Sequence, residues 1–164
     1  MKDLEIIAEP GVPQVVMTRE VDAPRDLVFR AFVEPELLVR WLGPRNLEMK
    51  IDVFEPRDGG RWRYVHRDPD GNEHWFHGVF HGDPTPDQTV QTFEYEGAPG
   101  HVSLDTATFE ERDGRTIVRM NSVFQSVEAR DGMVQAGMEY GVREGFEKLD
   151  ELLAELQSCA ETAS

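Results

Sequence analysis

The sequence is poor in cysteine, in basic residues and in long apolar runs, and each shortage excludes a class of protein. Its single cysteine, Cys159, leaves no basis for an intrachain disulfide framework or a cysteine-based metal site. The 17 lysines and arginines face 32 aspartates and glutamates, for a net charge of −15. Nucleic acid and anionic membranes are therefore poor partners, because phosphate binding needs clustered basic side chains. Without a basic leader or a membrane-length apolar run, we expect a cytoplasmic protein with no membrane insertion.

The chain has the length and composition of one globular domain. Its 164 residues are 39% hydrophobic, which is enough to build a core without disulfides. Pro10, Gly11 and Pro13 separate the first residues from an apolar run. We therefore expect an N-terminal arm or short extra strand over 1–13, the domain over 14–157 and a flexible tail over 158–164.

Most of the chain shows the two-residue alternation of side chains that is typical of antiparallel β-strands. Residues rich in β-branched and aromatic side chains alternate with polar ones, and turn signals such as Asp58-Gly59-Gly60 separate the runs. The pattern predicts about seven strands, over 14–21, 47–54, 61–67, 73–82, 88–96, 101–110 and 115–124. The inward face of the 73–82 strand stays open, because a single bulge reverses it.

Helical periods appear at two places in the chain. Two short helices are expected, one over 24–33 and one from Pro35 through Trp41. Apolar residues then recur at helical spacing from Met133 to Leu156, which predicts one long helix with Asp131 as a capping group. Because the sheet must cover one face, the sequence predicts an α+β fold in which a curved antiparallel sheet grips this helix.

The order of the short motifs resembles one family. The motifs are Arg19-Glu20-Val21-Asp22-Ala23-Pro24, Val28-Phe29-Arg30-Ala31-Phe32, Trp41-Leu42-Gly43-Pro44, Gly59-Gly60-Arg61-Trp62, Gln91-Thr92-Phe93-Glu94, Phe124-Gln125-Ser126, Arg130-Asp131-Gly132-Met133 and Gly137-Met138-Glu139. Together they resemble the bacterial proteins related to the C-terminal domain of the activator of the heat-shock chaperone ATPase. That family lies in the START-like (SRPBCC) superfamily, with the birch pollen allergen. The resemblance implies a helix-grip fold with a hydrophobic cavity between sheet and helix.

Two departures from the family pattern limit what the resemblance implies. Many relatives carry two tryptophans where this chain has Trp41-Leu42, at the expected mouth of the cavity. The chain also leaves no room for the separate chaperone-binding domain of the eukaryotic cochaperone. A chaperone contact is therefore expected to be possible but has no support in the residues themselves.

A small hydrophobic or lipid-like molecule is the expected ligand of this cavity. Gly137, Gly141 and Gly145 are four apart and share one helix face, where each costs about 1 kcal/mol relative to alanine. They leave space either for a ligand along the helix or for close packing against the sheet. The expected lining is Trp41, Trp62, Tyr64, His66, Phe76, Phe93, Met120, Phe124, Met138, Gly141, Val142 and Gly145.

No motif in the sequence fixes a catalytic or metal-binding role. The polar candidates for acid–base chemistry are His66, Tyr64, Glu94, Arg119 and Glu139, and none lies in a known catalytic pattern. His77 and His81 lie roughly 13 Å apart on one strand, too far to share an ion. His66 could meet His74 or His77 across strands, but two histidines do not make a zinc site. We therefore expect no metal and no cofactor.

Three functions remain open from the sequence. The first, which we favour, is non-catalytic binding of a hydrophobic ligand, in a stress-response-type bacterial role. The second is a cyclase-type or hydrolase-type enzyme that uses the same cavity and needs converging inward polar groups. The third is a chaperone-accessory interaction module, which needs an exposed apolar patch. A homodimer is compatible with all three.

Overall fold

Eight strands and four helices form in the part of the chain that the structure describes. The computed structural model describes the backbone of residues 3–163 and the side chains of residues 3–159. The elements are β1 (Glu5–Ile7), β2 (Gln14–Val21), α1 (Arg25–Val33), α2 (Pro35–Leu38), β3 (Glu48–Phe54), β4 (Arg61–Arg67), β5 (Glu73–Val79), β6 (Gln88–Tyr95), β7 (Val102–Arg112), β8 (Arg115–Val123), α3 (Val127–Gln135) and α4 (Met138–Ala163).

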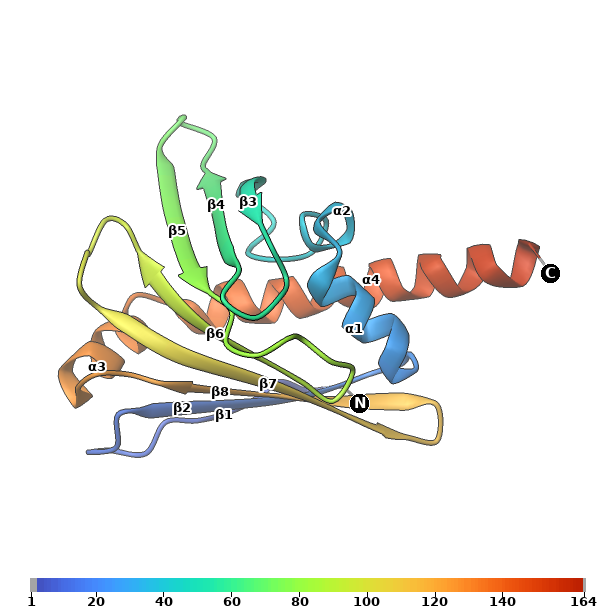
Figure 1. Ribbon diagram of the computed structural model, residues 1–164, viewed down its shortest axis with the longest axis horizontal. Helices are drawn as coiled ribbons and strands as arrows, with labels where there is room; N and C mark the ends of the chain where they lie inside the picture. The colour runs from blue at the N-terminus through green and yellow to red at the C-terminus, as the bar shows by residue number, and fades with distance from the viewer. Residues whose placement is uncertain (1–2, 164) are drawn as a thin grey trace.

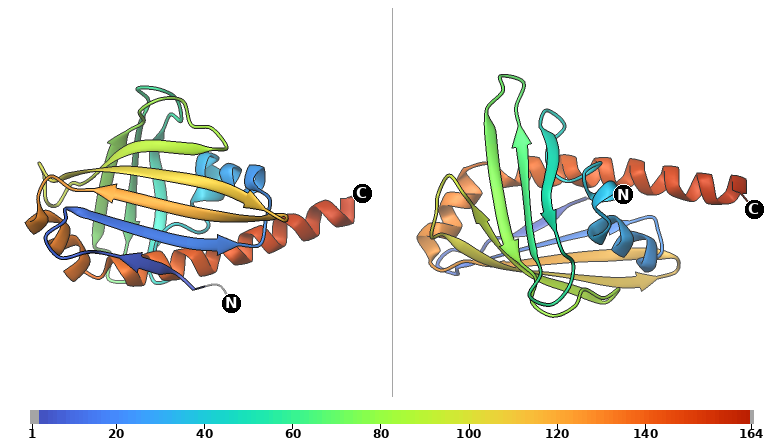
Figure 2. Two further views of the ribbon diagram at one scale, coloured as in Figure 1. Left: turned by 90° about the horizontal axis from the view of Figure 1, so that it is seen from below. Right: turned by 45° about the horizontal axis from the view of Figure 1, so that its top comes forward.

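The strands form one antiparallel sheet in the order β1-β2-β8-β7-β6-β5-β4-β3. In Figure 1, β1, β2, β8 and β7 run beneath α4, whereas β5, β4 and β3 stand steeply to them. The sheet therefore curves around α4, with α1 and α2 near one end, as the turned views show (Figure 2). This confirms the helix-grip architecture, with β1 added from the N-terminal arm as the eighth strand.

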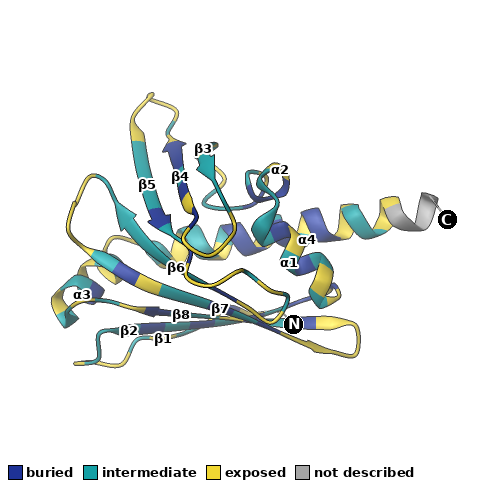
Figure 3. Ribbon diagram, viewed as in Figure 1, coloured by how far each residue is buried: buried dark blue, intermediate teal, exposed yellow. Residues whose placement is uncertain are grey.

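The inner face of the sheet is set by strict alternation along β2. Val15, Met17, Arg19 and Val21 are buried, and the residues between them are only partly buried (Figure 3). Arg19 is the one charged member of this set. Its Nη2 lies 2.6 Å from Oδ2 of Asp150 on α4, so the inward charge is paired with the helix that covers it.

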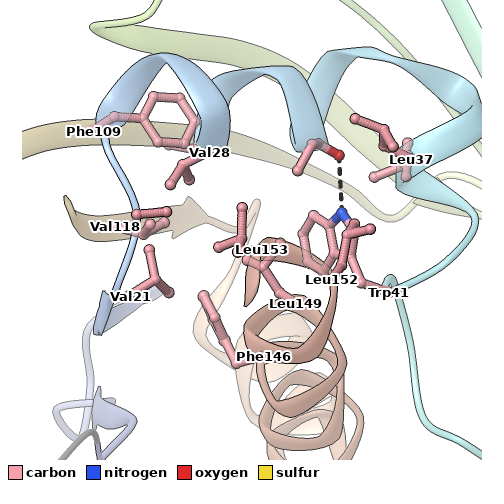
Figure 4. Close-up of a cluster of buried hydrophobic side chains, with 14 of the residues drawn as sticks. Val21, Val28, Leu37, Trp41, Phe109, Val118, Phe146, Leu149, Leu152 and Leu153 are labelled. Atoms are coloured by element: carbon pink, nitrogen blue, oxygen red, sulfur yellow. Dashed lines mark hydrogen bonds between the residues drawn. The ribbon is translucent and has the colours of Figure 1, made fainter. Parts of the chain in front are cut away.

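A large part of the core lies between the middle of α4 (residues 146–153), α1 and the strands beneath them. Phe146, Leu149, Leu152 and Leu153 are almost fully buried along one stripe of α4. Figure 4 shows them facing side chains of β2, α1, β7 and β8. They meet Val21, Val28, Phe109 and Val118 there. Burial of this stripe fixes the middle of α4 against the sheet.

The start of the long helix differs from the sequence expectation. The predicted single helix from Met133 is divided, because α3 ends at Gln135 and Gly137 adopts a left-handed φ of 89° before α4 begins. Gly137 therefore lies between helices rather than on the α4 stripe. The assignment of Asp131 as the cap was also wrong: it lies inside α3, and Ser126 is the N-cap.

We expect Ser126→Ala to lower the free energy of unfolding by about 1 kcal/mol. The Ser126 hydroxyl accepts a hydrogen bond from the Ala129 amide at 3.0 Å, and alanine leaves that donor without a protein acceptor. Urea unfolding measures the change. Ser126→Asp, which keeps an acceptor at the cap, should retain most of the stability; an equal loss in both variants would contradict a capping role.

Candidate functional site

The strand register settles which face of β5 points toward α4. Tyr64 pairs with Phe76, and His66 pairs with His74. Cross-strand partners share a face of the sheet, so Phe76 and His74 lie on the inner face with the buried side chains of β4. Trp75 and His77 therefore lie on the outer face. This resolves the choice that the sequence left open.

A continuous set of aromatic rings covers the inner face of β4, β5 and β6. Trp62 stacks on Tyr64 with ring centroids 5.2 Å apart, and Tyr64 lies 5.3 Å from Phe76. Phe76 in turn lies 5.4 Å from Phe93, which lies 5.9 Å from Trp62. We call Trp62, Tyr64, Phe76 and Phe93 the aromatic face. All four were predicted from the sequence as ligand contacts.

Part of the aromatic face remains accessible to solvent. Trp62 and Tyr64 are buried, but Phe76 and Phe93 are only partly buried. β5 and β6 have neighbours on both sides in the sheet, so this accessible surface is not that of a sheet edge. It belongs to the face itself, and α4 does not fully cover it.

The start of α4 (residues 138–142) is covered less completely than its middle (residues 146–153). Met138 and Val142 are partly buried and pack against the main core, whereas Phe146 and Leu149 are almost fully enclosed. Met120 on β8 and Phe124 just after it are also partly buried against this core. All four of these predicted contacts are therefore partly buried at the margin of the main core.

Gly141 and Gly145 allow the helix to approach the segment after α2. A Cβ on Gly145 would lie 3.2 Å from the Trp41 carbonyl oxygen, and one on Gly141 would lie 3.4 Å from Cδ of Pro44. The two glycines thus serve close packing, although against residues 41–44 rather than against the sheet. Trp41 is buried in the core, and its Nε1 donates to the Ala31 carbonyl at 2.9 Å (Figure 4).

Two buried nitrogens on the inner face of β4 have no hydrogen-bond partner among the described residues. They are Nε1 of Trp62 and Nε2 of His66. Burial lowers the pKa of His66 to about 4, with the charges of Lys148 and His74 acting in the same direction. His66 is therefore neutral at neutral pH, and its unpaired Nε2 can accept or donate one hydrogen bond, depending on the tautomer.

An inward carboxylate on β7, Asp105, was not predicted from the sequence. Asp105 pairs with Gln91 and Ser122 in the register, on the same face as the buried residues Ala107 and Phe109. The Ser103 hydroxyl donates to its Oδ1 at 3.0 Å. Burial raises the pKa of Asp105 to about 6, although hydrogen bonds from Ser122 and Ser103 act in the opposite direction.

Asp105 is electrostatically linked to the aromatic face. Burial, and then the negative charge of Asp105, raise the pKa of Tyr64. Ser103, which holds Asp105, is the cross-strand partner of Phe93. The inner face therefore has rings on β4 to β6 and a carboxylate with two serines on β7 and β8. We call Ser103, Asp105 and Ser122 the polar end.

The other polar candidates from the sequence do not join this site. Glu94 lies on the outer face beside His77, and its Oε2 accepts from the Gly100 amide at 2.9 Å. Arg119 is exposed on the outer face of β8. Glu139 pairs with Arg143 one turn along α4, at 2.7 Å. Of the five candidates, only Tyr64 and His66 point inward.

Two hollows lie elsewhere on the molecule. One of about 190 Å³ lies on the outer face around Arg63, His77, Gly78 and Glu96. The other, of about 110 Å³, lies between Ala8 and α3. Neither of these two lies between the aromatic face and α4. No three metal-binding side chains gather within the part of the chain whose side chains are described.

None of the helices within residues 3–163 has an apolar stretch long enough to cross a bilayer. This finding concerns the described helices alone.

Known structures share this fold over nearly the whole chain. A protein from Rhodobacter sphaeroides is 27% identical with a TM-score of 0.84, over 94% of this chain and 99% of its own. One from Arthrobacter aurescens is also 27% identical with a TM-score of 0.84, over 92% and 91%. CalU16 from Micromonospora echinospora, 20% identical with a TM-score of 0.60 over 99% and 91%, is similar in fold alone.

The sequence comparisons identify the family. Comparison with curated proteins gave no match. A family model described as "Activator of Hsp90 ATPase homolog 1-like protein" matches residues 22–154. That span runs from the residue after β2 into the buried stripe of α4, and it includes the aromatic face and the polar end. The chain therefore belongs to the family of Activator of Hsp90 ATPase homolog 1-like proteins.

Proposed function

We propose that the protein binds a small hydrophobic molecule on the inner face of its sheet, in front of the start of α4 (residues 138–142). The observation that carries this is the accessible surface of Phe76 and Phe93, two inward rings on interior strands. Accessible apolar surface on an inward face is costly in water. A flat or chain-like apolar ligand that covers these rings would remove that cost.

The contrast along α4 supports the same location. Phe146, Leu149, Leu152 and Leu153 complete the core without any ligand. Met138 and Val142, at the start of α4, keep accessible surface.

Methionine methyl groups provide a direct test of binding and its location. We expect tryptophol, a neutral indole alcohol, to shift the NMR signals of Met120, on the inner face of β8, and Met138, at the start of α4. Met133 lies in α3 outside the hydrophobic clusters and serves as the internal reference. Binding without a shift at Met120 or Met138, or no binding at all, would contradict the proposal.

Two aromatic substitutions, one on each face of the sheet, test which face binds the ligand. Phe93→Ala removes an inner ring and should weaken tryptophol binding by about tenfold. Trp75→Ala removes a ring from the outer face, where it stacks under Arg63 at 3.9 Å, and should leave the affinity unchanged. Isothermal titration calorimetry measures both affinities. Equal effects of the two variants would mean that the ligand does not lie on the inner face.

The two alternative functions have weaker support. An enzyme needs an acid and a base that converge, and no hydrogen bond links Asp105 to His66 or Tyr64 among the described side chains. An interaction module needs an exposed apolar patch, and Leu104 and Val123 do pair on the outer face with 44% and 42% of their surface exposed. Two such residues are a small patch, so ligand binding remains the better-supported function.

A further inference from the structure

Asp105 is an interior carboxylate without a cation beside it. Its hydrogen bonds come from Ser103 and Ser122, which are neutral. No ion pair involving Asp105 is found among the side chains of residues 3–159. By contrast, the buried charge of Arg19, on the inner face of β2, is paired with Asp150. A buried charge is normally paired, so an unpaired one beside accessible rings indicates a partner from outside the chain.

The residue remains within reach of such a partner. Asp105 keeps part of its surface accessible even though it lies on the inner face. Its neighbour Ser103 is opposite Phe93, the ring that ends the aromatic face on β6. A molecule lying on Phe76 and Phe93 would thus present one end to the carboxylate.

We propose that this site binds a hydrophobic amine, with its ammonium group paired to Asp105 and its apolar part on Tyr64, Phe76 and Phe93. This inference rests on the ligand-binding function proposed above and names the class of ligand. An ammonium group supplies the missing countercharge and can donate to the carboxylate lone pairs that the two serines leave free. Aromatic ring faces also attract cations, so the surroundings favour the same charge.

The positive charges of Lys148 and Arg19 determine which way the amine lies in the site. Lys148 on α4 acts on His66, at the β4 end of the aromatic face, and a cation placed there would be repelled. Arg19 is held by Asp150 and is unavailable to neutralise Asp105. The ammonium group is therefore directed to the polar end on β7 and β8, and the apolar part toward β4.

Three indoles of different charge test the proposal by calorimetry at pH 7.5 and physiological salt. Tryptamine is a cation, tryptophol is neutral and indoleacetate is an anion, all on one ring system. We expect wild-type protein to bind tryptamine about tenfold more tightly than tryptophol, and indoleacetate most weakly. In Asp105→Asn the preference for tryptamine should fall to less than about twofold, with tryptophol affinity retained.

The protein's net charge of −15 attracts any cation, so a matched control is needed. Asp113→Asn makes the same chemical change in the exposed turn between β7 and β8, at a φ of 54° that asparagine tolerates. It should keep the full preference for tryptamine. If both variants lose the preference equally, the selectivity is a property of the whole surface and the proposed pairing with Asp105 is wrong.

The outcomes separate this inference from the function on which it rests. Equal affinity of wild-type protein for tryptophol and tryptamine would overturn the amine specificity and leave hydrophobic binding in place. Failure of all three indoles to bind would overturn both. Far-ultraviolet circular dichroism of Asp105→Asn establishes that a lost preference does not reflect a lost fold.

Discussion

Asp105→Asn is expected to raise the free energy of unfolding by about 2 to 3 kcal/mol at pH 8. Burial holds the pKa of the Asp105 carboxyl near about 6 in the folded protein, against 3.8 for an exposed aspartate. The charged form is therefore harder to accommodate in the fold than in the unfolded chain. Asparagine keeps an acceptor for Ser103 or Ser122 and carries no charge, so this cost disappears.

The sign of the effect reverses the usual behaviour of aspartate. With a folded-state pKa above the unfolded one, the protonated carboxyl stabilises the fold at low pH, and that stability is lost as the pH rises through about 6. The difference between variant and wild type should therefore be near zero below about pH 4 and should reach its full size above about pH 7. Other groups that titrate in this range, including His66, affect both proteins and cancel in the difference.

Urea unfolding from pH 4 to pH 8 measures this difference directly. The exposed Asp113→Asn variant is the control and should show no comparable rise with pH. A difference that stays constant across the range would mean that the ionisation of Asp105 does not oppose folding. A variant less stable than wild type at pH 8 would mean that the carboxylate has a cationic partner.

The fold could be predicted from the sequence because the two-residue alternation of its strands and the helical spacing of apolar residues in α4 are both clear. β4 begins and ends where the alternation of residues 61–67 placed it, and β2 does the same for residues 14–21. The apolar stripe on α4 identified the buried residues Phe146, Leu149, Leu152 and Leu153. A sheet of this length with one long helix has few ways to cover its inner face. Once the strands and the helix were identified, the helix-grip architecture could therefore be predicted.

The inward face of β5 could not be predicted because both of its faces carry large rings. Trp75 and His77 alternate with Phe76 in the sequence, and periodicity gives no reason to prefer either set. The choice depends on the pairing of Tyr64 with Phe76 across the strands. That register is a property of the hairpin and not of the strand alone.

Asp105 was missed because the local pattern suggests the opposite orientation. In the run Ser103-Leu104-Asp105 the apolar residue would be expected to point inward, yet Leu104 is exposed and Ser103 is buried. Ala107 and Phe109, further along the same strand, carry the signal that could have corrected this. The division of the long helix had a signal too, since Gly137 is the residue type that ends a helix at positive φ.

The unequal enclosure of α4 leads to the second large prediction. Leu149→Ala should lower the free energy of unfolding by about 2 to 5 kcal/mol, because Leu149 has no exposed surface and its removal leaves a cavity. Val142→Ala should cost about 1 kcal/mol or less, since Val142 is only partly buried in the ligand-free protein. Urea unfolding of the two variants without ligand measures both losses.

The comparison is informative because both residues lie on one helix and lose only apolar atoms. If Val142→Ala proved as costly as Leu149→Ala, the start of α4 would be as tightly packed as its middle and would leave no room for a ligand. With the expected difference, tryptophol should stabilise wild-type protein by mass action, since it binds the folded state. That stabilisation should be smaller in Val142→Ala, which lacks two methyl groups at the proposed site. Val142 would then contribute more to binding than to folding, and Leu149 the reverse.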